Sequence, residues 1–393
     1  MTAIPKGYRI AVANAGFRKQ NRNDVALVVS DTPAITAAVF TQAAFKAAPV
    51  LVAQNLLLGG SPMRAVVINT GQANACTGNE GLVNCHTSLG MIAKATGLAP
   101  QEILPASTGV IGAQMKMDLW EKAAPVLASN LGSATIEDFA TAIRTTDSFA
   151  KYSGATVKCT NGDVTFAGMA KGAGMICPNM ATMLCVVLCD AAVNASVWQS
   201  LFKRAVDVTF NRVTVDGDTS TNDTVYGLAN GGSGVTVTET DLPQLEAALT
   251  KMLGELAYML VQDGEGATKV IHIAVTGAKN NTDAEKIART VGHSQLVKTA
   301  MYGKDANWGR IVAAVGRSGA DFVAKDVRVT MCGVELFRNE QPTDLDFDAL
   351  LKKPLEGRDL TLDISVGNGA GTYTLLASDL THEYVSVNAD YRS

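Results

Sequence analysis

Three polar, glycine-containing segments at the ends of apolar strands constrain the fold of this chain more than any other feature. They cover residues 69–78, 107–112 and 171–183. Residues 64–69 and 102–107 read as strands that run into the first two segments, and the apolar run at 183–188 follows the third. Short apolar runs bounded by such turn signals are typical of buried strands. The pattern predicts strands inside a mixed α/β fold, with irregular backbone at their ends.

Helical and strand patterns alternate along the rest of the chain. Helical spacing is found at residues 80–96, 196–211, 241–262 and 283–291, and further strands are expected at 155–160, 163–170 and 269–276. Asn161-Gly162 lies between two of these strands and suits a tight hairpin turn, because both residues accept positive φ.

The C-terminal third differs in pattern, because residues 326–338 and 359–378 alternate apolar and polar side chains. Such alternation predicts an antiparallel sheet with one buried face, in which the glycines of 367–371 turn the chain between strands. We therefore expect an α/β core over residues 1–280 and a smaller α+β domain over 281–393.

Composition excludes several classes of protein. The 393 residues are 47% hydrophobic and 18% charged, with a net charge of −4, which predicts a compact globular protein that binds small metabolites rather than nucleic acid. No segment resembles a secretory signal or a membrane span. The seven cysteines form no C-x-x-C pair, so reduced thiols in a cytoplasmic protein are expected.

Several familiar chemistries find no support in the motifs. The segment 216–223 begins like a calcium loop, but Thr221 replaces the glycine required at its sixth position. Gly172 and Gly174 form only part of a dinucleotide fingerprint, since Cys177 stands where its third glycine should be. There is no P-loop, and the four histidines lack zinc-ligand spacing, so no metal or cofactor is expected. Spacing alone leaves a Ser-His-Asp triad open, although no G-x-S-x-G elbow supports one.

The third polar segment offers an unusual nucleophile. Thr182 lies between an irregular stretch that contains Pro178 and the apolar run that begins at Met183. A chain break before Thr182 would give it a free α-amino group with a pKa near ~7.7–8, which can act as the base that a hydroxyl nucleophile requires. Backbone N–H groups in the other two segments could stabilise an oxyanion. From the residues alone, a threonine that opens a strand and two ordinary tight turns remain the alternatives.

The order of the motifs resembles one family. The segment KGAGMICPNMATM at 171–183 is similar to the processing site of the bifunctional ornithine acetyltransferases, also called glutamate N-acetyltransferases of arginine biosynthesis. The resemblance covers nearly the whole chain. Its other segments are NTGQANACTG at 69–78, STGVIG at 107–112, TTD at 145–147, DGDTSTND at 216–223, DGEGATK at 263–269, YGKDANWGR at 302–310 and EYVSVNADYRS at 383–393.

The resemblance implies a fold, a self-cleavage and a reaction. The fold is a layered mixed α/β (α+β) arrangement similar to N-terminal-nucleophile hydrolases, with a smaller and more antiparallel C-terminal domain. The chain is expected to cleave itself between Ala181 and Thr182 into α (1–181) and β (182–393) chains that form a heterotetramer. Thr182 then carries acetyl from N-acetylornithine to glutamate in a ping-pong reaction that needs no cofactor. Acetyl-CoA remains open as a second donor.

The resemblance also implies the roles of individual residues. Thr108 and Gly109 form the oxyanion hole. The substrate contacts are Thr145, Lys171, Thr182, Glu265, Asn388 and Ser393. Lys171 suits the α-carboxylate shared by both substrates, and Glu265 suits the α-ammonium. Ser393 stands where many relatives have threonine, and Cys177 and Cys185 replace small or apolar residues.

Two other functions remain open at this point. Self-cleaving aminopeptidases and amidases of related fold pass the acyl group to water instead of an amine. A binding protein could also keep the fold without being cut.

Overall fold

The computed structural model describes residues 2–18, 21–60, 62–177 and 183–390. The described residues divide into two compact units. Unit 1 contains those up to Asn211 and Asp218–Leu260, and unit 2 contains Arg212–Gly217 and those from Val261 to Asp390. The sequence-based boundary near residue 280 falls within unit 2, between its longest strand and the helix that follows.

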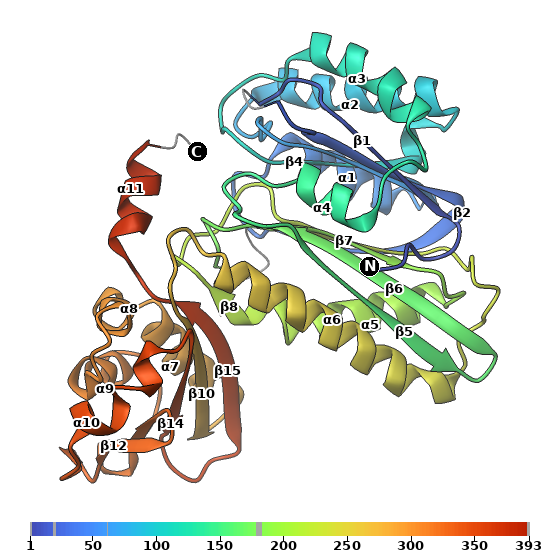
Figure 1. Ribbon diagram of the computed structural model, residues 1–393. Helices are drawn as coiled ribbons and strands as arrows, with labels where there is room; N and C mark the ends of the chain where they lie inside the picture. Colours follow the sequence, from blue (N-terminus) through green and yellow to red (C-terminus); the bar gives the residue numbers. More distant parts are fainter. Residues whose placement is uncertain (1, 19–20, 61, 178–182, 391–393) are drawn as a thin grey trace. The chain divides into compact units, whose positions relative to one another are not determined.

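Unit 1 alternates strands and helices along the chain (Figure 1). Its elements are β1 (Tyr8–Ala13), β2 (Val25–Phe40), α1 (Ala48–Leu58), β3 (Met63–Asn69), α2 (Gly78–Thr96), β4 (Ile103–Ser107), α3 (Met117–Ser129), α4 (Ile136–Ala142), β5 (Lys151–Cys159), β6 (Gly162–Lys171), β7 (Leu184–Cys189), α5 (Ala195–Asp207), β9 (Thr224–Ala229) and α6 (Leu242–Gln262), whose last two residues belong to unit 2.

The long strand β2 divides the sheet of unit 1 into two halves. The strand order is β4-β3-β2-β9-β7-β6-β5, with β1 also paired to β2. The first part of β2, Val25–Val29, pairs with β3, whereas Ile35–Phe40 pairs with β9, and the register shifts between the two parts. One strand therefore belongs to both halves.

The two halves pack face to face and are covered by helices on their outer faces. Side chains of β1–β4 meet side chains of β6, β7 and β9 in one core, while the other face of β1–β4 packs against α2 and α3. On the opposite side, α5 and α6 lie against glycines: Gly227 faces the Phe202 ring, and Gly168 faces Leu256. Figure 1 shows the resulting order of helices, sheet, sheet and helices. This confirms the layered mixed α/β fold.

Local signals explain where these helices begin and end. Gly97 adopts the left-handed conformation (φ +75°) at the C-terminus of α2, where its N–H bonds the Ala93 carbonyl. A capping box formed by Thr135 and Asp138 opens α4, with each side chain bonded to the other residue's N–H.

Unit 2 contains a second mixed sheet. Its elements are β8 (Val213–Thr214), β10 (Val270–Ala278), α7 (Asn281–Gly292), α8 (Gln295–Tyr302), α9 (Trp308–Gly316), β11 (Arg328–Met331), β12 (Val334–Arg338), β13 (Gln341–Pro342), α10 (Phe347–Leu351), β14 (Asp359–Ser365), β15 (Gly371–Ser378) and α11 (His382–Asp390). The strand order is β13-β12-β11-β14-β10-β15-β8. Alternate residues of β14 and β15 are buried, and they share a core with α7, α8 and α9. The expected burial of one face is confirmed.

Two connections differ from the sequence-based expectation. β14 and β15 do not form a hairpin, because β10 lies between them, parallel to β14 and antiparallel to β15. A pattern of alternation identifies a half-buried strand but not its neighbour. In the β5–β6 hairpin, Cys159 pairs with Gly162, so the two turn residues are Thr160 and Asn161 rather than Asn161 and Gly162.

Candidate active site

Thr108 and Gly109 follow directly after β4, and the end of β3 holds them in place. Parallel pairing sets Asn69 opposite Ser107, so both strands end at the same edge of the sheet. The Thr108 N–H donates to the Asn69 carbonyl (3.0 Å). Gly109 has φ +137°, and a Cβ there would lie 2.2 Å from the Gly71 carbonyl carbon. Only glycine fits this close approach of two backbones.

The buried side-chain amides of Asn222 and Gln72 stabilise the edge of the sheet where β3 and β4 end. Asn222, in the DGDTSTND segment, donates from Nδ2 to the carbonyls of Ala73 (2.6 Å) and Ser107 (2.9 Å). Gln72 accepts the Lys116 N–H on Oε1 (3.0 Å). The 69–78 and 216–223 segments therefore have a structural role, because these hydrogen bonds hold the turn that contains Thr108.

Lys171 brings the end of β6 to this turn. Its side chain is buried, and its Nζ donates to Thr108 Oγ1 at 3.4 Å. Two of the residues singled out from the sequence, 63 positions apart, are therefore in contact.

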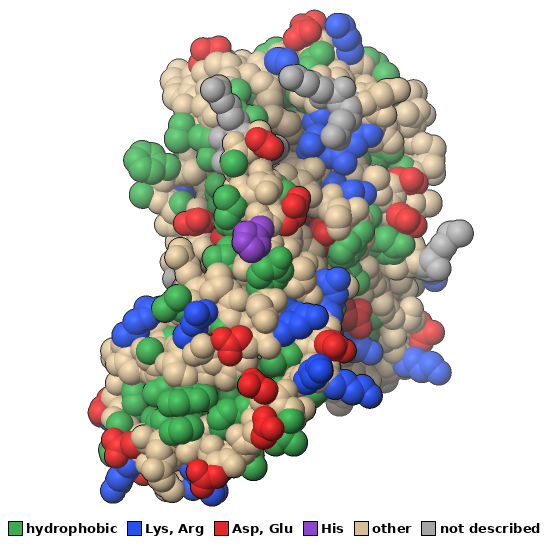
Figure 2. Space-filling view, turned by 60° about the vertical axis from the view of Figure 1, so that its left-hand side comes forward, with side chains coloured by type: hydrophobic (Ala, Val, Ile, Leu, Met, Phe, Trp, Pro, Cys, Tyr) green, Lys and Arg blue, Asp and Glu red, His purple; other side chains and the backbone are tan. Residues whose placement is uncertain are grey.

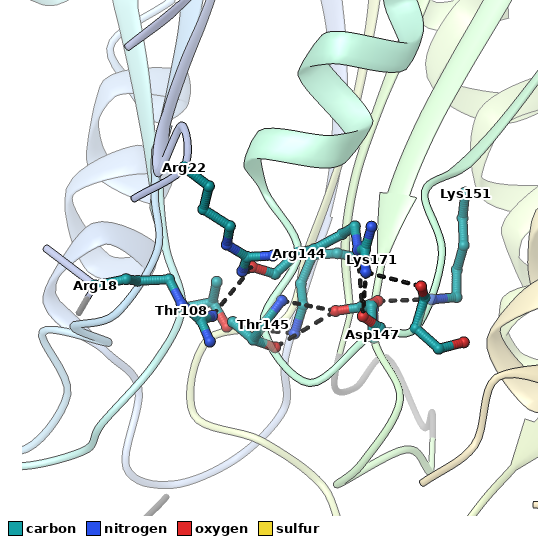
Figure 3. A network of polar contacts seen from close by, with 10 residues as sticks. Arg18, Arg22, Thr108, Arg144, Thr145, Asp147, Lys151 and Lys171 are labelled. Carbon is teal, nitrogen blue, oxygen red and sulfur yellow. Dashed lines mark hydrogen bonds and ion pairs between the residues drawn. The ribbon is translucent and has the colours of Figure 1, made fainter. Parts of the chain in front are cut away.

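Asp147 connects Thr145 to Lys171 (Figure 3). Its Oδ2 accepts the Thr145 N–H (2.8 Å), and its Oδ1 accepts both the Gly172 N–H (2.7 Å) and the Lys151 ammonium (2.7 Å). Burial alone would raise the pKa of Asp147. The charges of Lys151 and Lys171, together with hydrogen bonds from Lys151 and Gly172, outweigh it and hold that pKa well below its usual range. Asp147 is therefore ionised, and its carboxylate fixes the backbone at Thr145 and at Gly172.

Three arginines gather on the other side of the same loop. Arg18 Nη1 and Arg22 Nη2 both donate to the backbone carbonyl of Arg144, at 3.2 and 2.5 Å. The Arg144 guanidinium turns back to the carbonyls of Asp147 and Ser148. Figure 3 shows Arg18 and Arg22 reaching toward Arg144 from one side, with Thr108 and Thr145 beside them.

Glu265 and Asn388 meet in unit 2. Asn388 lies on α11, and its Nδ2 donates to Glu265 Oε2 at 2.8 Å and to the Tyr384 carbonyl at 3.0 Å. Tyr384, one turn earlier on the helix, donates its hydroxyl to Asp216 Oδ2 (3.3 Å). The structure thus pairs two more of the predicted substrate contacts within one unit.

The remaining predicted residues lie outside the described part of the chain. These are Ala181 and Thr182, which form the expected cleavage site, and Ser393 at the C-terminus. Cys177 and Cys185, the two departures from the family pattern, are both buried. Burial raises the pKa of the Cys185 thiol, which keeps it protonated.

The described ranges hold neither a metal-ligand cluster nor a membrane-spanning helix. Those residues contain no group of three or more His, Cys, Asp or Glu side chains arranged to hold a metal ion. Among their helices, none combines the length and the apolar character needed to cross a membrane. On the face shown in Figure 2, acidic and basic side chains are interspersed, in keeping with the small net charge.

Sequence reasoning missed Asp147 as a connecting residue and missed the three arginines altogether. Asp147 was visible only as the last letter of the TTD segment. An acidic and a basic residue four positions apart predict an ion pair when both lie on a helix. Asp147 and Lys151 form such a pair outside a helix, because Lys151 is the first residue of β5. Arg18 and Arg22 are more than 120 residues from Arg144, and no local pattern connects residues so far apart.

The family model and the sequence relatives both show one family. The ArgJ family model matches residues 9–393. The arginine biosynthesis bifunctional protein ArgJ of Nitratidesulfovibrio vulgaris is 66% identical over 393 residues, covering all of both chains, and that of Bacillus subtilis is 41% identical over 99% of this chain and 96% of its own. Among solved structures, ArgJ of Bacillus halodurans is 36% identical with a TM-score of 0.49, covering 51% of this chain and 96% of its own.

Proposed function

The chain belongs to the ArgJ family of arginine biosynthesis, and we propose that it transfers acetyl from N-acetylornithine to glutamate through an acetyl ester on Thr182. The observation that carries this proposal is the contact between Lys171 and Thr108, beside the loop of Thr145. It combines a buried cation for a carboxylate with a hydroxyl that can serve an oxyanion.

The first half-reaction forms the acetyl-enzyme. Thr182 Oγ attacks the acetyl carbonyl of N-acetylornithine while the α-amine of Thr182 takes the hydroxyl proton. Negative charge develops on the carbonyl oxygen, where the Thr108 hydroxyl and the Gly109 N–H stabilise it. The amide C–N bond then breaks, the proton passes to the departing nitrogen, and ornithine leaves.

The second half-reaction reverses these steps with another amine. The α-ammonium of glutamate gives a proton to the Thr182 α-amine, and the resulting amine attacks the ester carbonyl. The C–O bond of the ester then breaks, a proton passes from the new amide nitrogen to the Thr182 oxygen, and N-acetylglutamate leaves. Both substrates present an α-carboxylate, which Lys171 pairs with. Glu265 and Asn388 take the α-ammonium of the free amino acid, and Thr145 and Ser393 complete the contacts in this proposal.

A free amine on Thr182 requires prior cleavage of the chain. We propose that Thr182 Oγ first attacks the Ala181 carbonyl, that the acyl group moves from nitrogen to oxygen, and that water hydrolyses the ester. The products are chains 1–181 and 182–393, assembled as a cytoplasmic heterotetramer of two of each. Acetyl-CoA as a second donor to glutamate belongs to the same proposal, and glutamate with acetyl-CoA alone is the assay for it.

Thr182 variants test this function directly. Thr182→Ala is expected to leave a single chain of 41.1 kDa on a denaturing gel and to abolish transfer, because both steps need the hydroxyl. Thr182→Ser keeps the hydroxyl and should retain part of both. Cleavage at 181/182 in Thr182→Ala would refute the nucleophile. A wild-type protein that only hydrolyses its substrate, without forming N-acetylglutamate, would instead indicate an amidase.

A further inference from the structure

One peptide group lies between the arginines and Asp147. The peptide between Arg144 and Thr145 accepts Arg18 and Arg22 on its oxygen and donates its N–H to Asp147. The two guanidinium groups and that carboxylate therefore bind opposite ends of one planar peptide group. Arg18 and Arg22 are therefore adjacent to the backbone of Thr145, one of the proposed substrate contacts.

The positive charge of this group is not balanced by the nearby carboxylates. Asp24 accepts backbone N–H groups of Ala15 (2.7 Å) and Arg18 (3.1 Å), and Asp147 already binds the Lys151 ammonium. Burial and the neighbouring charges of Arg18 and Arg144 lower the pKa of Arg22, which means that these cations repel one another.

Donors also remain available on the arginines. A guanidinium has five N–H groups in a planar fork suited to a carboxylate. Within the described residues, the side chain of Arg18 makes one hydrogen bond and that of Arg22 one, and Arg22 Nε is buried with no partner. A buried donor without a partner costs free energy unless a ligand satisfies it. The group therefore has both the positive charge and the unused donors that an anion would satisfy.

We propose that Arg18 and Arg22, held on the Arg144 carbonyl, bind the side-chain carboxylate of the acceptor glutamate. This inference rests on the proposed function, in which Lys171 takes the α-carboxylate. The two carboxylates of glutamate are four carbon–carbon bonds apart, about 5 Å when extended, so the second carboxylate needs a cation close to the first. Asp147 connects the two groups of cations, because it accepts the Thr145 N–H of the peptide that binds the arginines and the Gly172 N–H next to Lys171. The phosphates of coenzyme A are separated from its acyl group by the whole pantetheine arm and fit this short spacing less well.

The two half-reactions distinguish a role in glutamate binding from a general effect of Arg18 and Arg22 on the active site. Exchange of labelled ornithine into N-acetylornithine uses only the first half-reaction and its reverse, whereas N-acetylglutamate formation needs glutamate. Arg22→Gln is expected to raise the KM for glutamate about ten- to a hundredfold and to leave ornithine exchange within about twofold of wild type. Arg18→Gln should act in the same direction, and Arg22→Lys should restore part of the loss.

Acceptor choice gives a second readout. Glutamine has the shape of glutamate without the side-chain charge, so Arg22→Gln should lower the preference for glutamate over glutamine. Arg9→Gln is the matched control, because Arg9 forms an exposed ion pair with Asp31 elsewhere in unit 1, and neither readout should change.

Each other outcome is decisive. Equal losses in exchange and transfer in a folded Arg22→Gln protein would overturn the inference, as would a rise in the KM for acetyl-CoA with that for glutamate unchanged. Wild-type protein that shows neither exchange nor transfer would refute the proposed function itself, which keeps the two failures distinct.

Discussion

The Asp147 carboxylate lies 2.7 Å from the Lys151 ammonium, and neither side chain is exposed to solvent. A buried ion pair stabilises a fold only when further hydrogen bonds satisfy its remaining atoms. Asp147 meets that condition through the N–H groups of Thr145 and Gly172. The pair therefore fixes the loop of Thr145 against the end of β6, where Lys171 lies.

Asp147→Asn should destabilise the protein strongly. It leaves the Lys151 ammonium buried without its counter-ion, for which a loss of about 3–5 kcal/mol in the free energy of unfolding is expected. Guanidinium unfolding of purified protein measures it. The matched control is Asp31→Asn, which breaks a half-exposed pair with Arg9 and should cost about 1 kcal/mol or less. Equal losses in the two variants would contradict the buried-pair account.

Thr108→Val should impair the chemical step more than binding. The substitution keeps the shape of the side chain but removes the hydroxyl proposed to stabilise the oxyanion. Loss of one such donor lowers kcat by about 10²–10³-fold. Steady-state kinetics should show this fall with a smaller change in KM, and Thr108→Ser should keep most of the activity. An unchanged kcat in Thr108→Val would remove Thr108 from the oxyanion hole.

Gly109→Ala tests the close approach of the two polar turns. The new methyl group would lie 2.2 Å from the Gly71 carbonyl carbon and 2.5 Å from the Gln72 nitrogen, and φ is +137°. The backbone must move, so a lower melting temperature and a large loss of transfer are expected together. Gly112→Ala is the comparison, since that position also has positive φ (+82°) but open space around its Cβ. Similar effects at both positions would mean that backbone strain, not the contact with Gly71, dominates.

The strands and helices were largely predictable because their signals are local. The apolar run at 64–69 is β3, and the helical spacing at 80–96 lies within α2. What the sequence could not supply is pairing across distance. The insertion of β10 between β14 and β15, and the sharing of β2 by two halves of a sheet, depend on the packing of whole layers.

The site was predictable only through ordered motifs. Thr108, Thr145 and Lys171 each lie in a segment that resembles the family. The structure connects them through the contact of Lys171 with Thr108 and through Asp147, which accepts the N–H groups of Thr145 and Gly172. Arg18 and Arg22 stand outside those segments, and each looks like an ordinary surface cation. The two arginines come together only because both bind the Arg144 carbonyl, more than 120 residues away in the sequence. No local sequence pattern predicts such a contact.

His293 should make the stability of unit 2 depend on pH in the mildly acid range. Burial and the nearby charges of Arg289, Lys298 and Arg317 lower its pKa from 6.5 to about 4. Between those values the unfolded chain binds a proton that the native protein does not, so stability falls as the pH falls from 6.5 to 4, by at most about 1.4 kcal/mol per unit. Asp147, whose pKa is lowered, loses its contribution only at more acid pH.

His293→Gln removes this proton and should flatten the pH dependence in that window. Guanidinium unfolding of the wild type and the variant at pH 7, 5.5 and 4 measures it. His86→Gln is the matched control, because it removes an exposed histidine from α2 and leaves the His293 ring in place. The prediction fails if wild type and His293→Gln lose stability in parallel between pH 6.5 and 4, since the proton would then be bound elsewhere.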